Sequence, residues 1–473
     1  SMAPSCSKTG YATLDSGTCR NFKNPFDWTG MKSKGLIIAG TQSSSGKTAL
    51  TSMLLAAIKQ RGIPVQPFKV GPDFIDPGYH RVYSGEDSIN LDSWIMGESE
   101  VCQAAGKFTL NRVGIAEGVM GLFDGANPDD DQGSTMEIAR WLEWPVLLVV
   151  DASHAGRSIA AAIRGFIEEA GPGTIAGLIL NRLGSEGHGT YLRKACAELE
   201  VPVLGMLPKI PELMWPERHL GLQASQERRL PEVQQMAELA ENRLDLSGIL
   251  NFLQLPDSAQ DMVNQEEPRN GQKKRIGVAR DEAFHFYYRA NLEWLRTSGA
   301  EVIPFSPLND QTLPPNLDGL VIGGGFPEIY AEQMSVNHGM REALQEAIAS
   351  DLPCYAECGG LMLLAEAMQT QDGAQHPMVG AIPGSVKMTD RLQHFGYCQA
   401  RLDHDLSFRG HEFHYSSWNQ EKSQANAWTV QRHADGRERV EGFKNGNLHA
   451  SYVHLYFPKA RAMLSPMLGL EGS

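Results

Sequence analysis

The apolar residues of this chain gather in short, nearly continuous runs that are separated by longer stretches of mixed polarity. In the first half the runs lie at 34–40, 63–70, 112–120, 145–151 and 176–181. Runs of this length are typical of strands buried on both faces, and the stretches between them have helix-like patterns. Buried strands that alternate with helices form a parallel sheet with helices on both sides. The pattern therefore predicts an α/β fold with a doubly wound sheet.

A second series of apolar runs begins later in the chain. These runs lie at 275–281, 300–306, 318–325 and 352–358, and a polar stretch with Pro and Gly at 265–274 precedes them. A polar segment of that composition is typical of a linker. The predicted divisions are a poorly ordered extension at 1–32, an α/β domain at 33–250, a linker at 251–272 and a second α/β domain at 273–473.

The composition narrows the classes of protein to consider. Of the 473 residues, 42% are hydrophobic and 21% are charged, as in ordinary globular proteins. No apolar run approaches the ~20 residues of a membrane span, and we expect no secretory signal. The net charge of −14 argues against nucleic acid as the main partner, because phosphate binding needs a basic surface. The seven cysteines include no Cys-x-x-Cys pair, so we expect a cytoplasmic protein that binds small molecules; a homodimer stays open.

The segment DLPCYAECGGLMLL (351–364) places a cysteine on a sharp turn between a predicted strand and a predicted helix. Gly359 and Gly360 follow Cys358 and remove the Cβ clashes that would forbid such a turn. At a helix N-terminus the backbone N–H groups favour the thiolate. A buried, unreactive thiol is an equally good explanation of this segment taken alone. The alternative is a nucleophile elbow, in which Cys358 attacks a substrate.

Two further segments favour the nucleophile. The buried run DGLVIGGG (318–325) ends in three glycines, a natural source of backbone donors for an oxyanion. Near the C-terminus, SYVHLYF supplies His454 as a general base and acid. The predicted catalytic residues are Cys358 and His454, and the predicted oxyanion donors are Gly324, Gly325 and Gly359.

The first half contains GTQSSSGKT (40–48) between a predicted strand and a predicted helix, which is the structural context of a phosphate-binding loop. Backbone N–H groups of such a loop surround the phosphates, while the lysine reaches the β- and γ-oxygens and the hydroxyl of Thr48 ligates Mg²⁺. A Gly/Ser-rich turn without a ligand is the alternative. The predicted ATP-binding residues of the loop are Ser44, Ser45, Gly46, Lys47 and Thr48.

Two acidic motifs follow at strand ends, where ligands bind in open α/β sheets. FKVGPDFIDPGYH (68–80) contains Asp73, and EGVMGLFDG (117–125) begins with Glu117. Phosphoryl transfer needs carboxylates to hold magnesium. We therefore expect Thr48, Asp73 and Glu117 to be the metal ligands. Asp76 and Asp124, in the same two motifs, also suit caps of turns.

HEFHY (411–415) suggests a zinc site at first sight. The zinc spacing of metalloproteases needs His at i and i+4, but position 415 is Tyr. His411 and His414 would point to opposite faces of a strand. We therefore expect these histidines to line a site or to support the structure and not to bind metal.

These motifs together resemble two known families. The segments around Cys358 and His454 are similar to class I glutamine amidotransferases, in particular to the branch of the cobyrinic and cobyric acid synthases. Most class I glutaminases carry His-x-Glu, whereas position 456 here is Tyr; that branch also lacks the acid, so the group that orients His454 stays open. The loop has its glycine at 40 instead of 41 and resembles that of dethiobiotin synthetase and its relatives. By that resemblance, Asn181 contacts adenine.

Residues 34–458 as a whole resemble the cobyrinic acid a,c-diamide synthase family. The resemblance implies a P-loop amidoligase domain followed by a flavodoxin-like glutamine amidotransferase domain, with ATP and Mg²⁺ as cofactors. The implied reaction is amidation of the a and c acetates of cobyrinic acid, through an acyl phosphate and ammonia released from glutamine. Sirohaem and nickel-sirohydrochlorin stay open as substrates. An alternative of another class is a regulatory P-loop ATPase with a non-catalytic glutaminase-like domain.

A tetrapyrrole polycarboxylate is planar and multiply charged, and we expect it to bind between the two domains. An acidic protein must concentrate its few basic groups at such a site, and Lys69 and His80 flank the acidic pair of the first motif. The predicted substrate-binding residues are Lys69, Asp76, His80 and Asp124.

Overall fold

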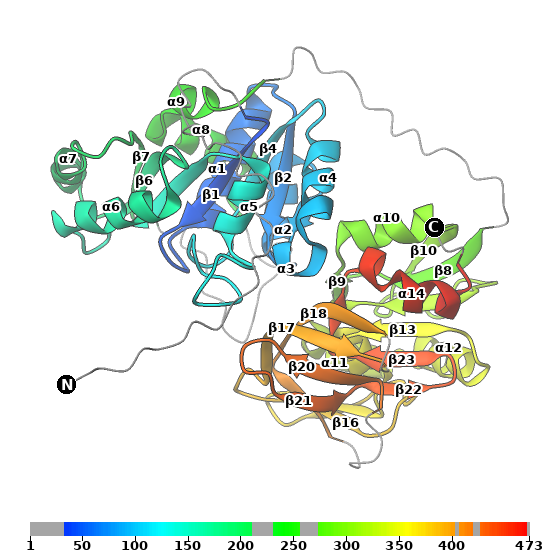
Figure 1. Cartoon of the computed structure of the whole chain (residues 1–473). Coiled ribbons are helices and arrows are strands. Elements are labelled where there is room, and N and C mark those ends of the chain that lie inside the picture. The colour runs from blue at the N-terminus through cyan, green and yellow to red at the C-terminus, as the bar shows by residue number, and fades with distance from the viewer. Residues whose placement is uncertain (1–32, 211–229, 256–272, 403–405, 420–425, 471–473) are drawn as a thin grey trace, which may run out of the picture.

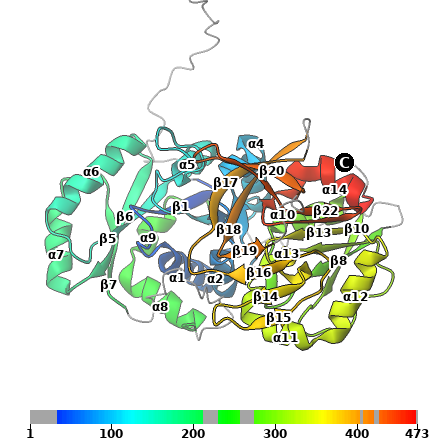
Figure 2. The ribbon, with the colours of Figure 1, turned by 90° about the horizontal axis from the view of Figure 1, so that it is seen from below.

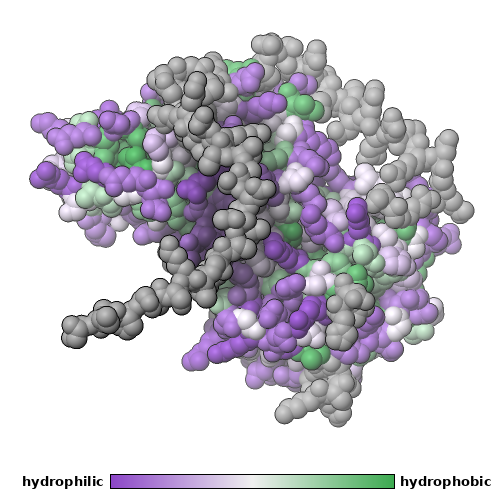
Figure 3. All heavy atoms as spheres, viewed as in Figure 1, coloured by the Kyte–Doolittle hydropathy of each residue, from purple (hydrophilic) through white to green (hydrophobic). Residues whose placement is uncertain are grey.

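The computed structural model describes residues 33–210, 230–255, 273–402, 406–419 and 426–470. The predicted extension at 1–32 and most of the predicted linker, 256–272, lie outside these residues. Within them the chain forms two α/β halves, of which the first lies at the upper left of Figure 1 and the second at the lower right. Hydrophilic residues cover most of the face shown in Figure 3, with smaller hydrophobic areas among them.

The first half is built on a seven-stranded sheet with the order β3-β2-β4-β1-β5-β6-β7, and every neighbouring pair is parallel. This confirms the predicted parallel α/β fold. The strands are β1 (Gly35–Gly40), β2 (Val65–Val70), β3 (Ile89–Leu91), β4 (Val113–Glu117), β5 (Val146–Asp151), β6 (Ile175–Leu183) and β7 (Val203–Pro208). β1 lies in the middle of the sheet, so the loop that follows it opens beside the ends of β4 and β5.

Helices cover the sheet of the first half. They are α1 (Lys47–Gln60), α2 (Asp76–Ser84), α3 (Ser93–Met96), α4 (Glu98–Phe108), α5 (Thr135–Leu142), α6 (Ser158–Ala170), α7 (Glu186–Ala195), α8 (Val233–Arg243) and α9 (Leu246–Leu250). Helix α1 is rich in Ala and Leu, which are strong helix formers, and it ends just before Gly62 at φ +69°. Its residues from Leu50 to Ile58 are buried. After α9, Leu253 forms an isolated parallel bridge with Ser33, which lies just before β1.

The second half has a six-stranded sheet with the order β10-β8-β11-β13-β23-β22. Its strands are β8 (Lys274–Ala279), β10 (Ala300–Phe305), β11 (Gly319–Ile322), β13 (Cys354–Glu357), β22 (Phe443–Asn445) and β23 (Leu448–Ser451). Only the pair of β22 and β23 is antiparallel. The helical segments are α10 (Arg289–Thr297), the 3₁₀ turn η2 (Pro327–Tyr330), α11 (Ala331–Val336), α12 (His338–Ala349), α13 (Gly359–Leu364) and α14 (Phe457–Leu468).

The second half also contains smaller antiparallel layers that the apolar pattern did not predict. A five-stranded sheet has the order β21-β20-β17-β18-β24, a four-stranded one β15-β14-β16-β19, and β12 pairs with β9. The bounds are β9 (Phe284–Phe286), β12 (Gly324–Gly325), β14 (Ala367–Gln369), β15 (Gln375–Pro377), β16 (Ser385–Met388), β17 (His394–Arg401), β18 (Ser407–His414), β19 (Ser416–Asn419), β20 (Trp428–Arg432), β21 (Glu438–Glu441) and β24 (His454–Leu455).

The five-stranded sheet joins the two halves, and Figure 2 shows β17 and β18 beside the first half. The hydroxyl of Tyr397 on β17 donates to Asp92 Oδ2 at 3.1 Å. Arg409 on β18 donates to the carbonyl of Trp94 at 2.9 Å, and its guanidinium lies 4.2 Å from the centre of that indole ring. A cavity of about 1020 Å³ is lined by residues of both halves. No helix of the described residues is both long and apolar enough to cross a membrane.

Candidate active sites

Cys358 lies on the sharp turn that its sequence predicted, directly after β13 and before α13. Its backbone has φ +48° and ψ −102°, a conformation that non-glycine residues rarely adopt and that costs on the order of 1–3 kcal/mol. A Cβ atom at Gly360 would lie 2.3 Å from the carbonyl oxygen of Ile322, so only glycine fits there. The geometry is that of a nucleophile elbow, and Cys358 lines the cavity shared by the two halves.

The glycine loop lies next to this turn. Gly324 and Gly325 form β12, and a Cβ atom at Gly325 would lie 1.8 Å from the carbonyl oxygen of Ala283. A Cβ atom at Gly359 would lie 3.2 Å from the backbone nitrogen of Gly325. The predicted oxyanion donors are therefore neighbours, because the backbones of both segments approach more closely than side chains would allow.

His454 comes from β24, at the edge of the five-stranded sheet, and its side chain is buried beside Cys358. Burial opposes protonation of the imidazole, but the neighbouring Cys358 and Glu357 raise the pKa of His454 to about 10. The structure thus brings together the predicted nucleophile and base. A protonated imidazole beside the thiol favours the thiolate.

Glu357 was not among the predicted site residues. Its Oε2 lies 3.5 Å from Nδ1 of His454. The signal in the sequence was a charged residue at the end of an otherwise apolar strand, immediately before the nucleophile.

Tyr456 stands where many glutaminases have an acid, and among the described residues its hydroxyl and its ring interact with groups other than His454. Burial and the nearby Glu100 and Glu293 raise the pKa of the Tyr456 hydroxyl. Its ring packs against that of Tyr288. The surroundings of the Tyr456 hydroxyl are therefore the carboxylates of Glu100 and Glu293.

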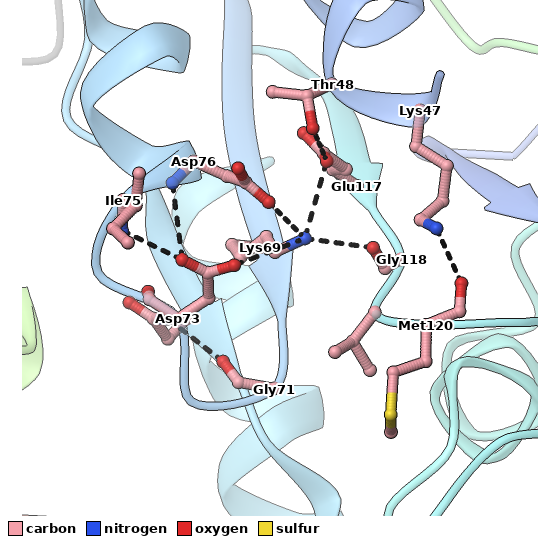
Figure 4. A network of polar contacts seen from close by, with 12 residues as sticks. Lys47, Thr48, Lys69, Gly71, Asp73, Ile75, Asp76, Glu117, Gly118 and Met120 are labelled. Carbon is pink, nitrogen blue, oxygen red and sulfur yellow. Dashed lines mark hydrogen bonds and ion pairs between the residues drawn. The ribbon is translucent and has the colours of Figure 1, made fainter. Parts of the chain in front are cut away.

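The P-loop leads from β1 into α1. Ser44 and Gly46 have left-handed conformations, with φ of +57° and +100°. Lys47 Nζ donates to the carbonyl oxygen of Met120 at 2.5 Å, as Figure 4 shows. Asn181 Nδ2 donates to the carbonyl oxygen of Ser45 at 2.8 Å. The predicted ATP-binding residues thus form one continuous site, and Asn181 approaches it from the end of β6.

Glu117 is the centre of a buried polar network below the P-loop (Figure 4). Its Oε1 accepts a hydrogen bond of 2.6 Å from the hydroxyl of Thr48, and its Oε2 lies 2.7 Å from Nε2 of His80. Lys69 Nζ lies 3.4 Å from Oε1 of Glu117. The register of the sheet explains the last contact, because Lys69 on β2 pairs with Glu117 on β4.

Lys69 connects Glu117 to the two aspartates of the first acidic motif. Its ammonium lies 2.8 Å from Asp76 Oδ2 and 3.8 Å from Asp73 Oδ2, and the residue is 1% exposed. Asp73 Oδ1 also accepts from the backbone of Ile75 at the start of α2. Such a cluster stabilises charges that would be costly to bury singly.

The predicted substrate-binding residues lie in different surroundings. Lys69, Asp76 and His80 are buried inside the network, and His80 is 0% exposed. Asp124 is exposed, and its Oδ2 accepts a hydrogen bond of 2.8 Å from the backbone of Gly121, as expected for a turn cap. A substrate carboxylate would reach the ammonium of Lys69 only by displacing one of its present partners.

Phe74 connects the two sites. It follows Asp73 in the chain, yet its ring lies 5.3 Å from that of His454 and 5.2 Å from that of Phe286, next to the glycine loop. Tyr288 lies at 4.8 Å from the same ring. A single residue of the first half therefore packs on the predicted base of the second.

The histidines of HEFHY support the site. His411 stacks on His454 at 4.9 Å, and His414 stacks on Tyr452 at 3.8 Å. Both histidines line the cavity, although the spacing along the strand predicted opposite faces. In the part of the chain that the structure describes, no group of three or more His, Cys, Asp or Glu side chains is arranged to hold a metal ion.

Comparison with known proteins supports the two halves separately. Residues 36–222 match the CobQ/CobB/MinD/ParA nucleotide binding domain, and residues 275–462 match the CobB/CobQ-like glutamine amidotransferase domain.

Whole proteins match over most of their length. A cobyrinate a,c-diamide synthase of Syntrophotalea carbinolica is 43% identical over 89% of this chain and 95% of its own length. The proteins of the same name from Listeria innocua and Priestia megaterium are each 40% identical over 92% of this chain, and over 98% and 96% of their own lengths.

Proposed function

The chain belongs to the cobyrinate a,c-diamide synthase family, and we propose that it converts the a and c acetates of cobyrinic acid to amides. It is a ligase that hydrolyses glutamine and uses ATP. The names of the relatives favour cobyrinic acid over sirohaem and nickel-sirohydrochlorin.

The first half would activate the carboxylate. When bound, ATP supplies the phosphoryl group that turns a poorly electrophilic carboxylate into an acyl phosphate. Ser44, Ser45 and Gly46 would surround the phosphates with backbone N–H groups, and Lys47 would neutralise their charge. Asn181 would contact the adenine. The loop that these residues form has a shape that suits phosphate binding. Its left-handed turns at 44 and 46 direct successive backbone N–H groups to one side.

A magnesium ion suits the residues below this loop. Mg²⁺ is usually held by one or two carboxylates, with waters and phosphate oxygens in the other positions. Thr48 and Glu117 are already in contact, and Asp73 is joined to Glu117 through Lys69. We propose Thr48, Asp73 and Glu117 as the ligands, with Asp76, His80 and Lys69 holding the carboxylates in place and Asp124 shaping the adjoining turn.

The second half would release ammonia from glutamine. Cys358 attacks the side-chain amide, the N–H groups of Gly325 and Gly359 stabilise the oxyanion, and His454 passes a proton to the departing ammonia. Water then hydrolyses the thioester to glutamate. Ammonia displaces phosphate from the acyl phosphate in the first half and forms the new amide.

One observation carries this proposal: Asp73 of the first site and Cys358 of the second line the same cavity of about 1020 Å³. A shared cavity gives ammonia a direct path from Cys358 to the first site, so that it can react before it is diluted into the solvent and protonated. A regulatory ATPase with an inactive glutaminase-like half would need neither this connection nor the strained backbone at Cys358.

The test is an assay with both nitrogen sources. The purified protein is incubated with ATP, Mg²⁺ and a panel of tetrapyrrole carboxylates, with either glutamine or an ammonium salt as the nitrogen source. The masses of the products are measured by mass spectrometry. With cobyrinic acid, the mass is expected to fall by about one unit for each of the two carboxylic acids that become amides. Absence of glutamine hydrolysis would overturn the proposal in favour of the regulatory alternative, and amidation of another macrocycle alone would overturn the substrate.

We further propose that the protein works in the cytoplasm, since the five described cysteines are all free. Its partners would be glutamine and the tetrapyrrole, without nucleic acid. Light scattering in solution decides whether it forms a homodimer.

Phe74→Ala is expected to uncouple the two sites. Without the ring that packs on His454, ammonia would escape and glutamine would be hydrolysed without amide formation. We expect the ratio of amide formed to glutamate released to fall several-fold, while synthesis from ammonium salts is retained. Phe395→Ala is the matched control, because that ring lines the same cavity but packs on Phe413. An unchanged ratio would contradict the coupling role.

Lys69→Met is expected to destabilise the first half strongly. The substitution leaves Asp73, Asp76 and Glu117 buried without their cation, and breaking a buried charge pair costs about 3–5 kcal/mol. Lys274→Met is the control, since its pair with Asp318 is exposed and such pairs contribute about 1 kcal/mol or less. Thermal unfolding of both variants compares the two effects. Unchanged stability with weaker, less salt-sensitive binding of the tetrapyrrole would instead favour the predicted substrate role of Lys69.

A further inference from the structure

His454 needs a partner for its second ring nitrogen, and the position that supplies an acid in many glutaminases does not provide one. Tyr456 stands there, and the carboxylates that act on its hydroxyl are those of Glu100 and Glu293. Nδ1 of His454 is fully buried and makes no hydrogen bond within the usual distance to any described residue. The nearest carboxylate oxygen is Oε2 of Glu357, at 3.5 Å.

We propose that Glu357, the residue directly before the nucleophile, is the positioning acid of the glutaminase site. The inference rests on the proposed function, because it assigns a role within the hydrolysis of glutamine. Glu357 lies on β13, whereas position 456, where many glutaminases carry the acid, directly follows β24.

The carboxylate of Glu357 is held in one orientation. Its Oε1 accepts hydrogen bonds from the backbone N–H of Leu455 at 2.9 Å and from the hydroxyl of Tyr355 at 2.8 Å. Both bonds go to the same oxygen, so Oε2 is left to face the imidazole. The residue is 5% exposed, and water therefore competes little for this oxygen.

The geometry of the strands explains why a side chain at position 357 reaches His454. Residues two apart on a strand point to the same side, so Tyr355 and Glu357 share one face of β13. Glu357 pairs with Ser451 on β23, and the chain reaches His454 three residues later. The turn at Cys358 then places the thiol beside the same imidazole. One strand thus positions both the nucleophile and the acid.

A carboxylate at Nδ1 would have two effects on the base. It keeps the N–H at Nδ1, so that Nε2 is free to take the proton of the Cys358 thiol, and it stabilises the imidazolium that results. Among the described residues, a further titratable group in contact with His454 is His411, which stacks on it from β18. Burial and the charge on His454 lower the pKa of His411 well below its usual value, so His411 stays neutral and does not compete for the proton.

A purely structural role is the alternative, in which Glu357 only holds the backbone at Leu455. Glu357→Gln separates the two roles, because the amide oxygen still accepts from Leu455 and Tyr355 while the amide nitrogen replaces Oε2. If Glu357 positions the base, kcat for glutamine hydrolysis falls roughly 100-fold or more with little change in KM. The reason is that a catalytic histidine held in the wrong tautomer lowers the rate of the reaction by up to about 10⁴-fold. Glu357→Asp retains the charge and is expected to recover part of the loss.

The reactivity of Cys358 gives a second readout that a structural role would not change. The rate of alkylation by iodoacetamide is followed against pH by mass spectrometry of the peptide that contains Cys358, because only the thiolate reacts. Loss of Glu357 makes the imidazolium less stable, so less thiolate forms at neutral pH. The midpoint of the profile is expected to move to higher pH in Glu357→Gln and to stay in place in the control, Tyr456→Phe.

The outcomes are distinguishable. If the wild type hydrolyses glutamine, and Glu357→Gln keeps both kcat and the alkylation profile, the inference on Glu357 is wrong and the proposed function stands. If the wild type does not hydrolyse glutamine, the proposed function fails first. Synthesis from ammonium salts reports whether Glu357→Gln is folded. If it is not, Tyr355→Phe decides, since it removes one bond to the carboxylate: a fall of about 10-fold in kcat supports the inference and an unchanged kcat overturns it.

Discussion

Cys358→Ser is expected to abolish amide formation from glutamine while synthesis from ammonium salts continues at close to the wild-type rate. Only the second half uses the thiol, and the first half meets ammonia in the same form whether it comes from glutamine or from solution. Loss of a nucleophile that acts together with its base costs roughly 10⁴-fold or more in kcat. Product formation from each nitrogen source, measured by mass spectrometry, gives the comparison.

Cys102→Ser is the control for this experiment. That thiol lies on α4 and contacts the backbone of Trp141, far along the chain from the turn at Cys358. It should leave both activities unchanged. An equal loss of the two activities in Cys358→Ser would contradict the division of the reaction between two sites.

Lys47→Ala is expected to remove synthesis from both nitrogen sources, because the acyl phosphate no longer forms. Taking a pre-organised charge from a phosphoryl-transfer site should raise the barrier by about 3 kcal/mol or more, by analogy with loss of one oxyanion donor. This corresponds to a fall of roughly 100-fold in kcat. The assay is ammonium-dependent amide formation at saturating ATP.

Lys59→Ala controls for a general loss of helix charge, since Lys59 is exposed at the other end of α1. Its turnover should match the wild type. Ammonium-dependent turnover of Lys47→Ala at the wild-type rate would show that residues 40–48 do not bind the phosphates.

Most of the strands that the sequence predicted were recognisable because both of their faces are buried, as in β1, β5 and β13. Each then needs a nearly continuous apolar run, as at 145–150, which contains most of β5. The antiparallel strands lack such runs. β21 has the sequence ERVE and is largely exposed, so its apolar content is low, and only pairing with β20 makes it a strand. β3 has three residues, too few for a recognisable pattern.

Part of the candidate site was predictable for a similar reason. The P-loop and the turn at Cys358 are both formed by consecutive residues, and their glycines permit conformations that other residues avoid. The structure shows a left-handed conformation at Gly46, whereas at the second turn the strained residue is Cys358 itself and Gly360 permits the close approach to Ile322. Local backbone geometry of this kind is encoded within a few residues, so the motif alone indicates it.

The sequence by itself thus determined the two α/β halves, the phosphate loop and the pairing of a thiol with a histidine. Only the tertiary structure decided that Glu357 faces His454, that Phe74 of the first half packs on that histidine, and that Lys69 is buried among carboxylates. These contacts join residues on different strands or in different halves; Glu357 and Leu455 are 98 positions apart. A side chain's partner at such a separation depends on the order and register of the strands, which no local run of residues specifies.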